Sequence, residues 1–569
     1  MVDLPRRWRR AVPAVAVVLA AGLVRAVHLA LLLRGGYVVD TDGVQYIGMA
    51  ESLLAGRGLT DVLGHPHDHF PPGYPALIAL LGPPLGGPIR GAVSLSLLGG
   101  MGACLFTYLC LLRLRLQDRR IPRWAPPAAG LLLAVHPLAV GLSCRVQADA
   151  PFAAMVVGAV LLNLVGRQCG MSGCTLGSLY LAAAAYLVKP EGLAYFCLLA
   201  LWEFVWPTRG DGLHPAASAR PRFRGRLHAG AGAAAALALL VAPYAWWISH
   251  QKGRPTLTGK SATWIHGFDE RGFENFVRLN FQLSSAGDRV VVAESAPGEA
   301  PSLRRLAIRY ASNLKRLWRA LCQVLPFGSV WLALGGALWL ATRRSPPSWV
   351  LAWGTLLLPM GLVPLFFVVP RLLHATLPVL LVPVALAPAA ALSWDRRVGR
   401  LLLGGLVLLG AGCLTSGVRE AMATNVPSDF WATLSWMQRH VEPGEVVVAG
   451  KPQLAFHSRA IHLSLPFTDA ARLARYMCLN RARWLVLGAG DVGSRPPLLP
   501  MWEGDSEPFR LVFATAASPR FELRVYRLDE EPSPCTPGDD GGPGGRPVSP
   551  RRIGRLRIEA RPTTPVPCP

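Results

Sequence analysis

Charged residues are scarce in this sequence. Asp, Glu, Lys and Arg together make up 16% of its 569 residues, whereas about 25% is usual for a soluble domain. Hydrophobic residues make up 52%, and the mean hydropathy is +0.34. This balance excludes an ordinary soluble enzyme and a disordered protein, because neither class combines so much apolar sequence with so little charge.

Acidic residues are scarcer than basic ones. The chain has 34 Asp and Glu against 58 Lys and Arg, which gives a formal net charge of +24. An excess of basic residues can indicate nucleic-acid binding. Here many of them flank long apolar runs, where they are typical of membrane topology. We therefore expect a membrane protein without a nucleic-acid partner.

Several motifs of metal and nucleotide chemistry are also missing. The sequence has no Cys-x-x-Cys pair, no zinc spacing of Cys and His, no P-loop, no His-Glu-x-x-His and no Gly-x-Ser-x-Gly. Several of the 11 cysteines lie within apolar runs. We interpret the cysteines as small hydrophobic residues and expect neither disulfides nor iron–sulfur clusters.

Long apolar runs, in contrast, are abundant. The first, 11–33, follows an Arg-rich start; it is long enough to cross a bilayer, which takes ~20 residues, and too long for the core of a cleaved signal peptide. Further spans are predicted near 91–112, 126–143, 150–165, 176–187, 193–206, 229–248, 325–341, 350–369, 372–392 and 401–414. The sequence thus predicts an α-helical polytopic membrane protein with about eleven transmembrane helices.

The loops between these spans differ in charge. If the N-terminus is cytoplasmic, four of the five inner loops are rich in Arg, as the positive-inside rule requires. Residues 34–72, 250–322 and everything after 416 then lie outside. Six basic residues between 304 and 319 are an exception, which the rule tolerates in a long loop. They predict a basic patch that faces outward near the membrane surface.

The last quarter of the chain changes character. Residues 430–441 have helical periodicity, and four segments have the pattern of strands; these segments are 445–449, 483–487, 509–513 and 521–526. We expect 1–416 to form the transmembrane module and 417–530 a small extracytoplasmic α/β domain. Residues 531–569 are rich in Pro, Gly, Ser and Arg, which predicts a disordered tail.

Two carboxylates follow the first span. Asp40 and Asp42 precede Tyr46 and Ala50, which are spaced four residues apart as on one face of a helix. Asp42 is well placed to cap this helix, and Gly56 is a plausible stop. A carboxylate here can act as a general base for a sugar-acceptor hydroxyl. A solvated loop with a capping Asp is the alternative.

A histidine-rich segment comes next. His65, His67, Asp68 and His69 lie within five residues, a combination that can indicate a metal site. A divalent metal would need a further ligand from the long outer loop, for which His266 is a candidate together with Asp269. The alternative is a polar loop before a proline-enforced turn.

Three further charged sites lie at the ends of predicted spans. They are Asp149, the pair Lys189 and Glu191, and Arg371 with His374. Charges at this depth are costly unless they are paired or used, and Lys and Arg are suited to a phosphate. Helix capping, a Lys–Glu pair and ordinary interfacial anchors are the alternatives.

Together these residues resemble the GT-C glycosyltransferases, in particular the bacterial members of the protein-mannosyltransferase superfamily that include the aminoarabinose transferase of lipid A. The resemblance covers roughly residues 1–530. The positions that match the family pattern are Asp42, Tyr46, Ala50, Gly56, Pro71, Pro72, Tyr74, Pro75, Asp149, Lys189 (in place of an Arg), Pro190, Glu191, Gly192 and Arg371. A small α/β domain after the last span also fits the family layout.

The resemblance implies inverting transfer of a sugar from a polyprenyl-phosphate carrier to a lipid, glycan or protein acceptor on the outer face. Asp42 would act as base or orient the acceptor, with Asp149 or Asp40 assisting. Tyr46, Lys189, Glu191, Arg371 and His374 would bind substrate, and a metal, if used, would involve His69 and His266. A bacterial plasma (inner) membrane is implied, with an ER membrane as the alternative. A secondary transporter, a lipid flippase and a non-catalytic membrane assembly protein remain alternative functions.

Overall fold

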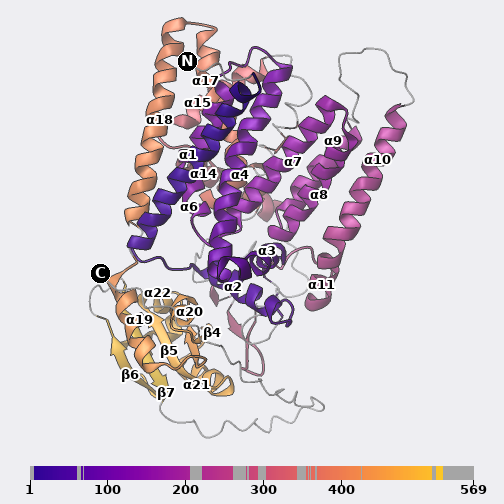
Figure 1. Ribbon diagram of the computed structural model, residues 1–569. Coiled ribbons are helices and arrows are strands. Elements are labelled where there is room, and N and C mark those ends of the chain that lie inside the picture. The colour runs from indigo at the N-terminus through magenta and orange to yellow at the C-terminus, as the bar shows by residue number, and fades with distance from the viewer. Residues whose placement is uncertain are drawn as a thin grey trace.

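The computed structural model is a bundle of long helices with a small mixed sheet at one end (Figure 1). It describes residues 6–60, 66–67, 69–205, 221–259, 277–278, 281–291, 303–342, 351, 354–355, 358, 360–365, 368–423, 426–515 and 521–528. The tail 531–569 lies outside this part of the chain, so its disorder stays a prediction.

The helices of the bundle follow the apolar runs of the sequence. They are α1 (Arg6–Arg34), α2 (Thr41–Leu54), α3 (Gly73–Leu81), α4 (Pro88–Gln117), α5 (Ala125–Val135), α6 (Pro137–Ser143), α7 (Asp149–Cys169), α8 (Ser172–Val188), α9 (Gly192–Val205), α10 (Pro221–Ala236), α11 (Ala242–Lys252), α14 (Leu303–Val324), α15 (Ser329–Ala341), α17 (Leu377–Leu392) and α18 (Arg396–Ala423). A π-helical turn, Leu237–Val241, joins α10 to α11, and two 3-10 helices, η3 (Val363–Leu365) and η4 (Pro370–Thr376), precede α17.

Among the described helices, six are long and apolar enough to cross a membrane, or eight if each of two bent pairs forms one span. The bent pairs are α5 with α6, at 59°, and α14 with α15, at 101°. The expected count of about eleven also included α8, α9 and the segment 350–369. The first two have only 17 and 14 residues, and the third is described only in part. The expected fold class, a helical multi-span membrane protein with a small C-terminal sheet, is confirmed.

Small residues allow the helices to pack closely. A Cβ at Gly99 in α4 would lie 2.5 Å from the backbone nitrogen of Pro151 in α7, so the two backbones touch there. Such small-residue contacts are how helices associate in lipid, where apolar burial alone gives no advantage. This contact places the start of α7, which carries Asp149, firmly against α4.

Gly192 marks a second close approach, beside the turn that carries Lys189. A Cβ there would lie 2.3 Å from the nitrogen of Tyr186, and backbone cannot yield as a flexible side chain can. We expect Gly192→Ala to cost ~3 kcal/mol of stability, as overpacking does, seen as a lower midpoint of thermal unfolding in detergent. Gly173→Ala is the matched control, because nothing lies within 4 Å of the position that a Cβ would take there; an unchanged midpoint for Gly192→Ala would contradict this packing.

The C-terminal sheet has five strands in the order β4-β3-β5-β7-β6. They are β3 (Val446–Ala449), β4 (Ile461–Ser464), β5 (Ala482–Gly488), β6 (Phe509–Ala514) and β7 (Leu523–Leu528), with α19 (Ser428–His440), α20 (Gln453–His457), α21 (Ala470–Leu479), α22 (Ala489–Gly493) and α23 (Leu499–Glu503) around them. β3 runs parallel to β4 and β5, and β7 runs antiparallel to β5 and β6. The four predicted strands and the predicted helix are confirmed, whereas β4 was missed.

Alternate residues of β3 and β5 enter two separate cores. Val448 and Leu485 belong to one hydrophobic cluster, and Val447 and Val486 to the other. This is the period of two that a sheet covered on both faces requires.

One expectation about the cysteines was wrong. Cys478 in α21 is disulfide-bonded, so the cysteines are not all simple hydrophobic residues.

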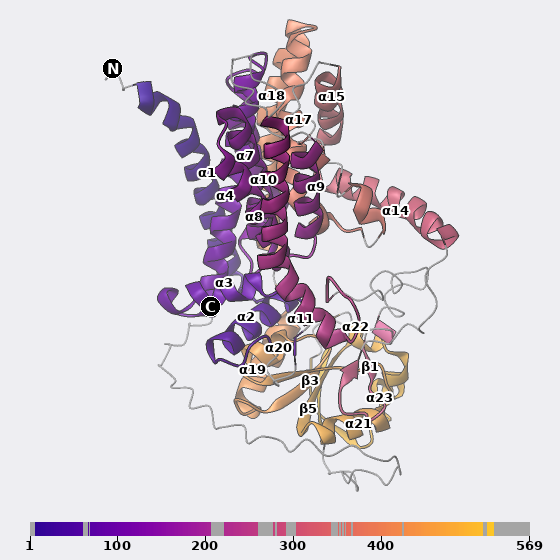
Figure 2. The ribbon, with the colours of Figure 1, turned by 90° about the vertical axis from the view of Figure 1, so that its right-hand side faces the viewer.

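The sheet unit contacts the loop that leads from α1 to α2 (Figure 2). The backbone N–H of Val39 donates to Nε2 of His457 at 3.3 Å, and Nε2 of Gln453 donates to the hydroxyl of Thr41 at 3.0 Å. Both contacts flank Asp40. Asp40 and the start of α2, which carries Asp42, are therefore held between the helical bundle and the C-terminal sheet.

Candidate active site

Asp40 and Asp42 have different positions at the start of α2. Asp40 is the N-cap residue, and its Oδ1 accepts from the backbone N–H of Gly43 at 2.9 Å. The expectation that Asp42 caps the helix was therefore wrong: Asp42 lies one residue inside, in the first turn, and its carboxylate is left for other partners. The helix ends as expected before Gly56, which has φ +70°.

Asp149 begins α7 and is the most deeply buried carboxylate of the site, at 1% exposure. Its Oδ1 lies 2.8 Å from Nζ of Lys189, which follows the end of α8, and its Oδ2 lies 2.9 Å from the guanidinium of Arg371 in η4. Each oxygen thus has its own cation. A buried charge needs such compensation, and the three residues come from segments far apart in sequence.

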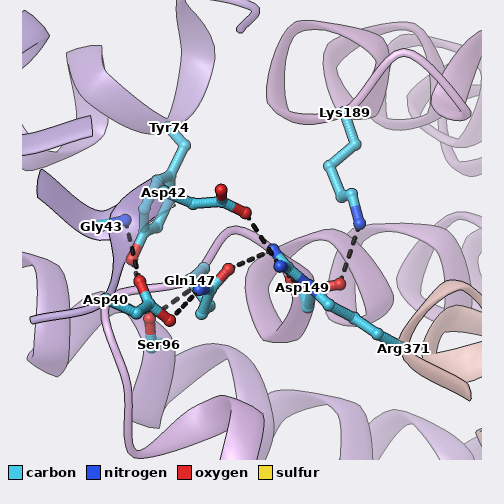
Figure 3. A network of polar contacts seen from close by, with 9 residues as sticks. All are labelled: Asp40, Asp42, Gly43, Tyr74, Ser96, Gln147, Asp149, Lys189 and Arg371. Carbon is cyan, nitrogen blue, oxygen red and sulfur yellow. Dashed lines mark hydrogen bonds and ion pairs between the residues drawn. The ribbon is translucent and has the colours of Figure 1, made fainter. Parts of the chain in front are cut away.

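Arg371 connects this buried cluster to the start of α2 (Figure 3). Its Nη1 lies 2.8 Å from Oδ2 of Asp42, and its Nη2 donates to the side-chain carbonyl of Gln147. The amide nitrogen of Gln147 in turn donates to Asp40. The planar guanidinium therefore joins three acceptors in a fixed arrangement, and one continuous network runs from Lys189 to Asp40.

Exposure separates the three carboxylates. The Asp42 side chain is 31% exposed and that of Arg371 is 35% exposed, whereas that of Asp149 is 1% exposed. Oδ1 of Asp42 has no hydrogen-bond partner among the described residues. Of the three, Asp42 is the one that combines access from outside with a free oxygen.

Asp40 is held differently. Burial raises the pKa of Asp40 above its ordinary value, although the hydrogen bonds from Gln147 and from the backbone N–H of Gly43 favour its charged form. Both of its oxygens already have partners. The contacts of Asp40 indicate that it fixes the start of α2 and the position of the Gln147 side-chain amide.

Two of the remaining predicted substrate-binding residues are buried. Tyr46 is 2% exposed and packs against Phe70 and Tyr74, with ring centroids 4.6 and 4.9 Å apart. His374 is 4% exposed, and its Nδ1 has no hydrogen-bond partner in the described structure. Glu191 is half-buried two residues after Lys189. Tyr46 lies on α2 and therefore packs this helix against α3.

A metal site is not assembled by the part of the chain that the structure describes, which contains no group of three or more His, Cys, Asp or Glu suited to a metal ion. His69 lies edge-on against Phe70, with centroids 4.6 Å apart. His266 and Asp269 lie outside the described residues, so the predicted metal ligands remain a prediction. At Asp149, Lys189 and Arg371 already occupy both oxygens.

Two polar residues of the network were missed from the sequence. Gln147 links Arg371 to Asp40, and the Ser96 hydroxyl donates to the backbone carbonyl of Gln147 at 3.0 Å while lying 2.9 Å from the Tyr74 hydroxyl. A single Gln or Ser near an apolar run carries little signal. The position of Gln147 two residues before Asp149 was the available hint.

A glycine motif was also missed. Residues 488–493 read Gly-Ala-Gly-Asp-Val-Gly, the Gly-x-Gly-x-x-Gly pattern, and they follow β5. In dinucleotide sites this pattern opens a helix whose N–H groups bind phosphate. Here α22 has only 5 residues, and the carboxylate of Asp491 itself accepts from the N–H of Gly488 at 3.0 Å. The position of a phosphate is thus filled by the protein's own anion.

We expect Arg371→Lys to lower any activity of this site by about 10²-fold, because one ammonium cannot hold Asp42, Asp149 and Gln147 in the geometry of a guanidinium. Arg90→Lys, at an exposed residue of α4, is the control. The measurement is the rate, for the purified variants, of the sugar transfer that the family resemblance implies. Equal rates for Arg371→Lys and the unmodified chain would show that the shape of the guanidinium is unimportant.

Comparison with solved structures gives the same architecture over most of the chain. ArnT from Cupriavidus metallidurans bound to undecaprenyl phosphate matches with a TM-score of 0.53 and 13% identity, over 90% of this chain and 97% of ArnT. The chain has the fold of a GT-C glycosyltransferase. The oligosaccharyltransferase of Archaeoglobus fulgidus, solved with a tethered acceptor peptide, matches with a TM-score of 0.53 and 13% identity, over 91% of this chain and 74% of that one.

A third structure adds to this likeness. AglB from Archaeoglobus fulgidus, in complex with an inhibitory peptide and a dolichol-phosphate, matches with a TM-score of 0.50 and 12% identity, over 83% of this chain and 69% of AglB. No protein-family model matches the sequence, and no curated protein matches it. The GT-C fold, which the sequence resemblance predicted, is confirmed, and the chain is a multi-pass integral membrane protein.

Proposed function

We propose that this protein is a glycosyltransferase that moves a sugar from a polyprenyl-phosphate carrier to an acceptor on the extracytoplasmic side of the membrane. The observation that carries the proposal is the buried Asp149 with its two cations, joined through Arg371 to the accessible Asp42. Cations at the end of a span suit a phosphate attached to a membrane lipid. ArnT and AglB, which share the fold, were solved with undecaprenyl phosphate and a dolichol-phosphate.

In the proposed reaction the acceptor hydroxyl attacks the anomeric carbon of the donor sugar. The new bond forms between the acceptor oxygen and that carbon, and the bond from the carbon to the phosphate oxygen breaks with its electron pair. The proton of the hydroxyl passes to Oδ1 of Asp42, the oxygen that Arg371 leaves free. Lys189 and Arg371 stabilise the negative charge that develops on the leaving phosphate, as positioned cations do.

The division of roles follows from exposure. Asp149 is nearly inaccessible and holds Lys189 and Arg371 in place, so we assign it a positioning role. Asp40 orders the loop and Gln147. Both oxygens of Asp149 are already paired with protein cations, so these residues do not fit a divalent metal, and the reaction is assigned to the two cations instead.

The disulfide of Cys478 supports an extracytoplasmic location for the C-terminal unit. A disulfide in the C-terminal unit is typical of an oxidising compartment outside the cytoplasm. The sheet unit and the start of α2 contact each other, so both would face that side. This agrees with the Arg-rich loops expected on the cytoplasmic face. We propose a bacterial plasma membrane as the location.

The test uses the full chain in lipid bilayers with radiolabelled polyprenyl-phosphate sugars and a mixture of envelope lipids, glycans and proteins. The label should leave the carrier and appear in an acceptor, with release of polyprenyl phosphate. A transporter or flippase would instead move the intact labelled lipid across the membrane of a sealed vesicle. That result, with no loss of sugar from the carrier, would refute the proposal.

A further inference from the structure

Helix α14 carries a strong charge that the proposed reaction does not use. The segment Leu303–Val324 has six basic residues, 304, 305, 309, 315, 316 and 319, and no Asp or Glu. Arg304, Lys315, Arg316 and Arg319 are exposed. A basic amphipathic helix is typical of a segment that lies on a membrane surface.

One narrow face of α14 packs against the protein. Asn313, Leu317, Ala320 and Val324, spaced three or four residues apart, are 1–6% exposed. The Asn313 side chain donates to the carbonyl of Pro364 in η3 at 2.9 Å. The helix therefore has a fixed rotation about its axis, which determines what its other faces meet.

A second face of α14 is apolar and exposed. Leu303, Leu314 and Trp318 are 85%, 45% and 43% exposed, and Ala307 and Ala311 between them are exposed as well. At 100° per residue these five lie along one stripe. Exposed apolar stripes of this length in a membrane protein are where lipid chains are expected.

A basic face lies beside the stripe. At the same angular spacing Lys315 and Arg319, with the exposed Ile308 between them, point away from both the packed face and the lipid-facing stripe. Arg304 borders the stripe, and Arg316 borders the packed face, where its Nη1 donates to Oδ1 of Asn313 at 3.3 Å. The helix meets α15 at 101° and projects sideways from the bundle (Figure 2). A helix across the direction of the spans, with one apolar and one cationic side, lies in the interface between acyl chains and water.

We propose that α14 is an interfacial helix that binds the phosphate headgroups of anionic phospholipids through Arg304, Lys315, Arg316 and Arg319. The occupant follows from charge, because the cationic face lies at headgroup depth, where anionic phospholipid is the abundant partner. The site goes beyond the proposed sugar transfer and does not depend on it. It adjoins η4, the segment that carries Arg371.

The test measures lipid preference with the full chain in bilayer nanodiscs. Spin-labelled phosphatidylglycerol and phosphatidylcholine report how strongly each lipid associates with the protein. We expect a preference for phosphatidylglycerol of about fivefold or more, weakened by high salt, since each basic residue near an anionic surface contributes about fivefold. The triple variant Lys315→Gln, Arg316→Gln, Arg319→Gln should lose most of this preference.

The matched control removes three exposed arginines from the sheet unit, as Arg472→Gln, Arg475→Gln, Arg483→Gln, and should keep the preference. Thermal midpoints of both variants establish that they are folded. An unchanged preference in the α14 variant, or none in the unmodified chain, would overturn the proposal. So would displacement of labelled phosphatidylglycerol by trace undecaprenyl phosphate, which would assign α14 to the carrier lipid instead.

Discussion

Replacing Asp42 with Asn is expected to lower sugar transfer by about 10³-fold while the protein stays folded. The reason is the loss of the only carboxylate oxygen in the described site that is both accessible and without a partner. A positioned general base typically contributes about 10²–10⁴-fold, so a change near the middle of that range follows. Stability should change by ~1 kcal/mol or less, because the ion pair with Arg371 is about one-third exposed.

The measurement is the rate of label transfer from the carrier, at equal amounts of folded protein. Glu51→Gln removes a carboxylate from an exposed position on the same helix and should have no effect. Asp40→Asn distinguishes the two neighbouring carboxylates, because Asn also caps a helix well. Full activity of Asp42→Asn with loss in Asp40→Asn would move the base to Asp40.

The largest loss of stability is expected from Asp149→Asn. This change leaves Lys189 and Arg371 without the buried carboxylate that each of them contacts at 2.8–2.9 Å. Removing one partner of a buried ion pair typically costs about 3–5 kcal/mol, because the remaining charge stays buried and uncompensated. Transfer should also be lost, since both cations would shift from the positions at which we propose that they meet the phosphate.

Thermal unfolding in detergent measures the effect. Asp429→Asn is the control, because Asp429 is also buried, at 2% exposure, but forms no ion pair with a described Lys or Arg. The double variant Asp149→Leu, Lys189→Met should unfold at a higher temperature than Asp149→Asn. Apolar replacement of both partners of a buried ion pair often restores stability in this way. A midpoint for Asp149→Asn as high as that of the control would mean that the two cations do not depend on Asp149.

The pattern of apolar residues in the sequence was sufficient to predict most elements of the fold. The helices α1, α4, α7 and α17 coincide with runs that only a membrane or a buried core can accommodate, and β5 follows from the four consecutive apolar residues 484–487. The pattern failed where an element is short or unusual. β4 has four residues of mixed character, and α14 was interpreted as a loop with a basic patch because six of its 22 residues are basic.

The site was harder to predict, because it is assembled from separate segments. Asp42, Asp149, Lys189 and Arg371 were all candidates by their position at span ends, and their mutual contacts are plain only in three dimensions. Gln147 lacked a charge and gave no comparable signal. The choice between Asp40 and Asp42 as the cap depended on a shift of two residues in the helix start, which apolar spacing does not resolve.

The most direct test of the account is the binding of the carrier itself, which requires no knowledge of the sugar or the acceptor. Undecaprenyl phosphate and undecaprenol differ only in the phosphate, and their affinities can be compared in bilayers that already contain phosphatidylglycerol. The account predicts at least about tenfold tighter binding of the phosphate, as charge-assisted hydrogen bonds supply. Lys189→Gln should largely abolish that difference, whereas Arg475→Gln should keep it. Equal binding of the two lipids by the unmodified chain would contradict the account.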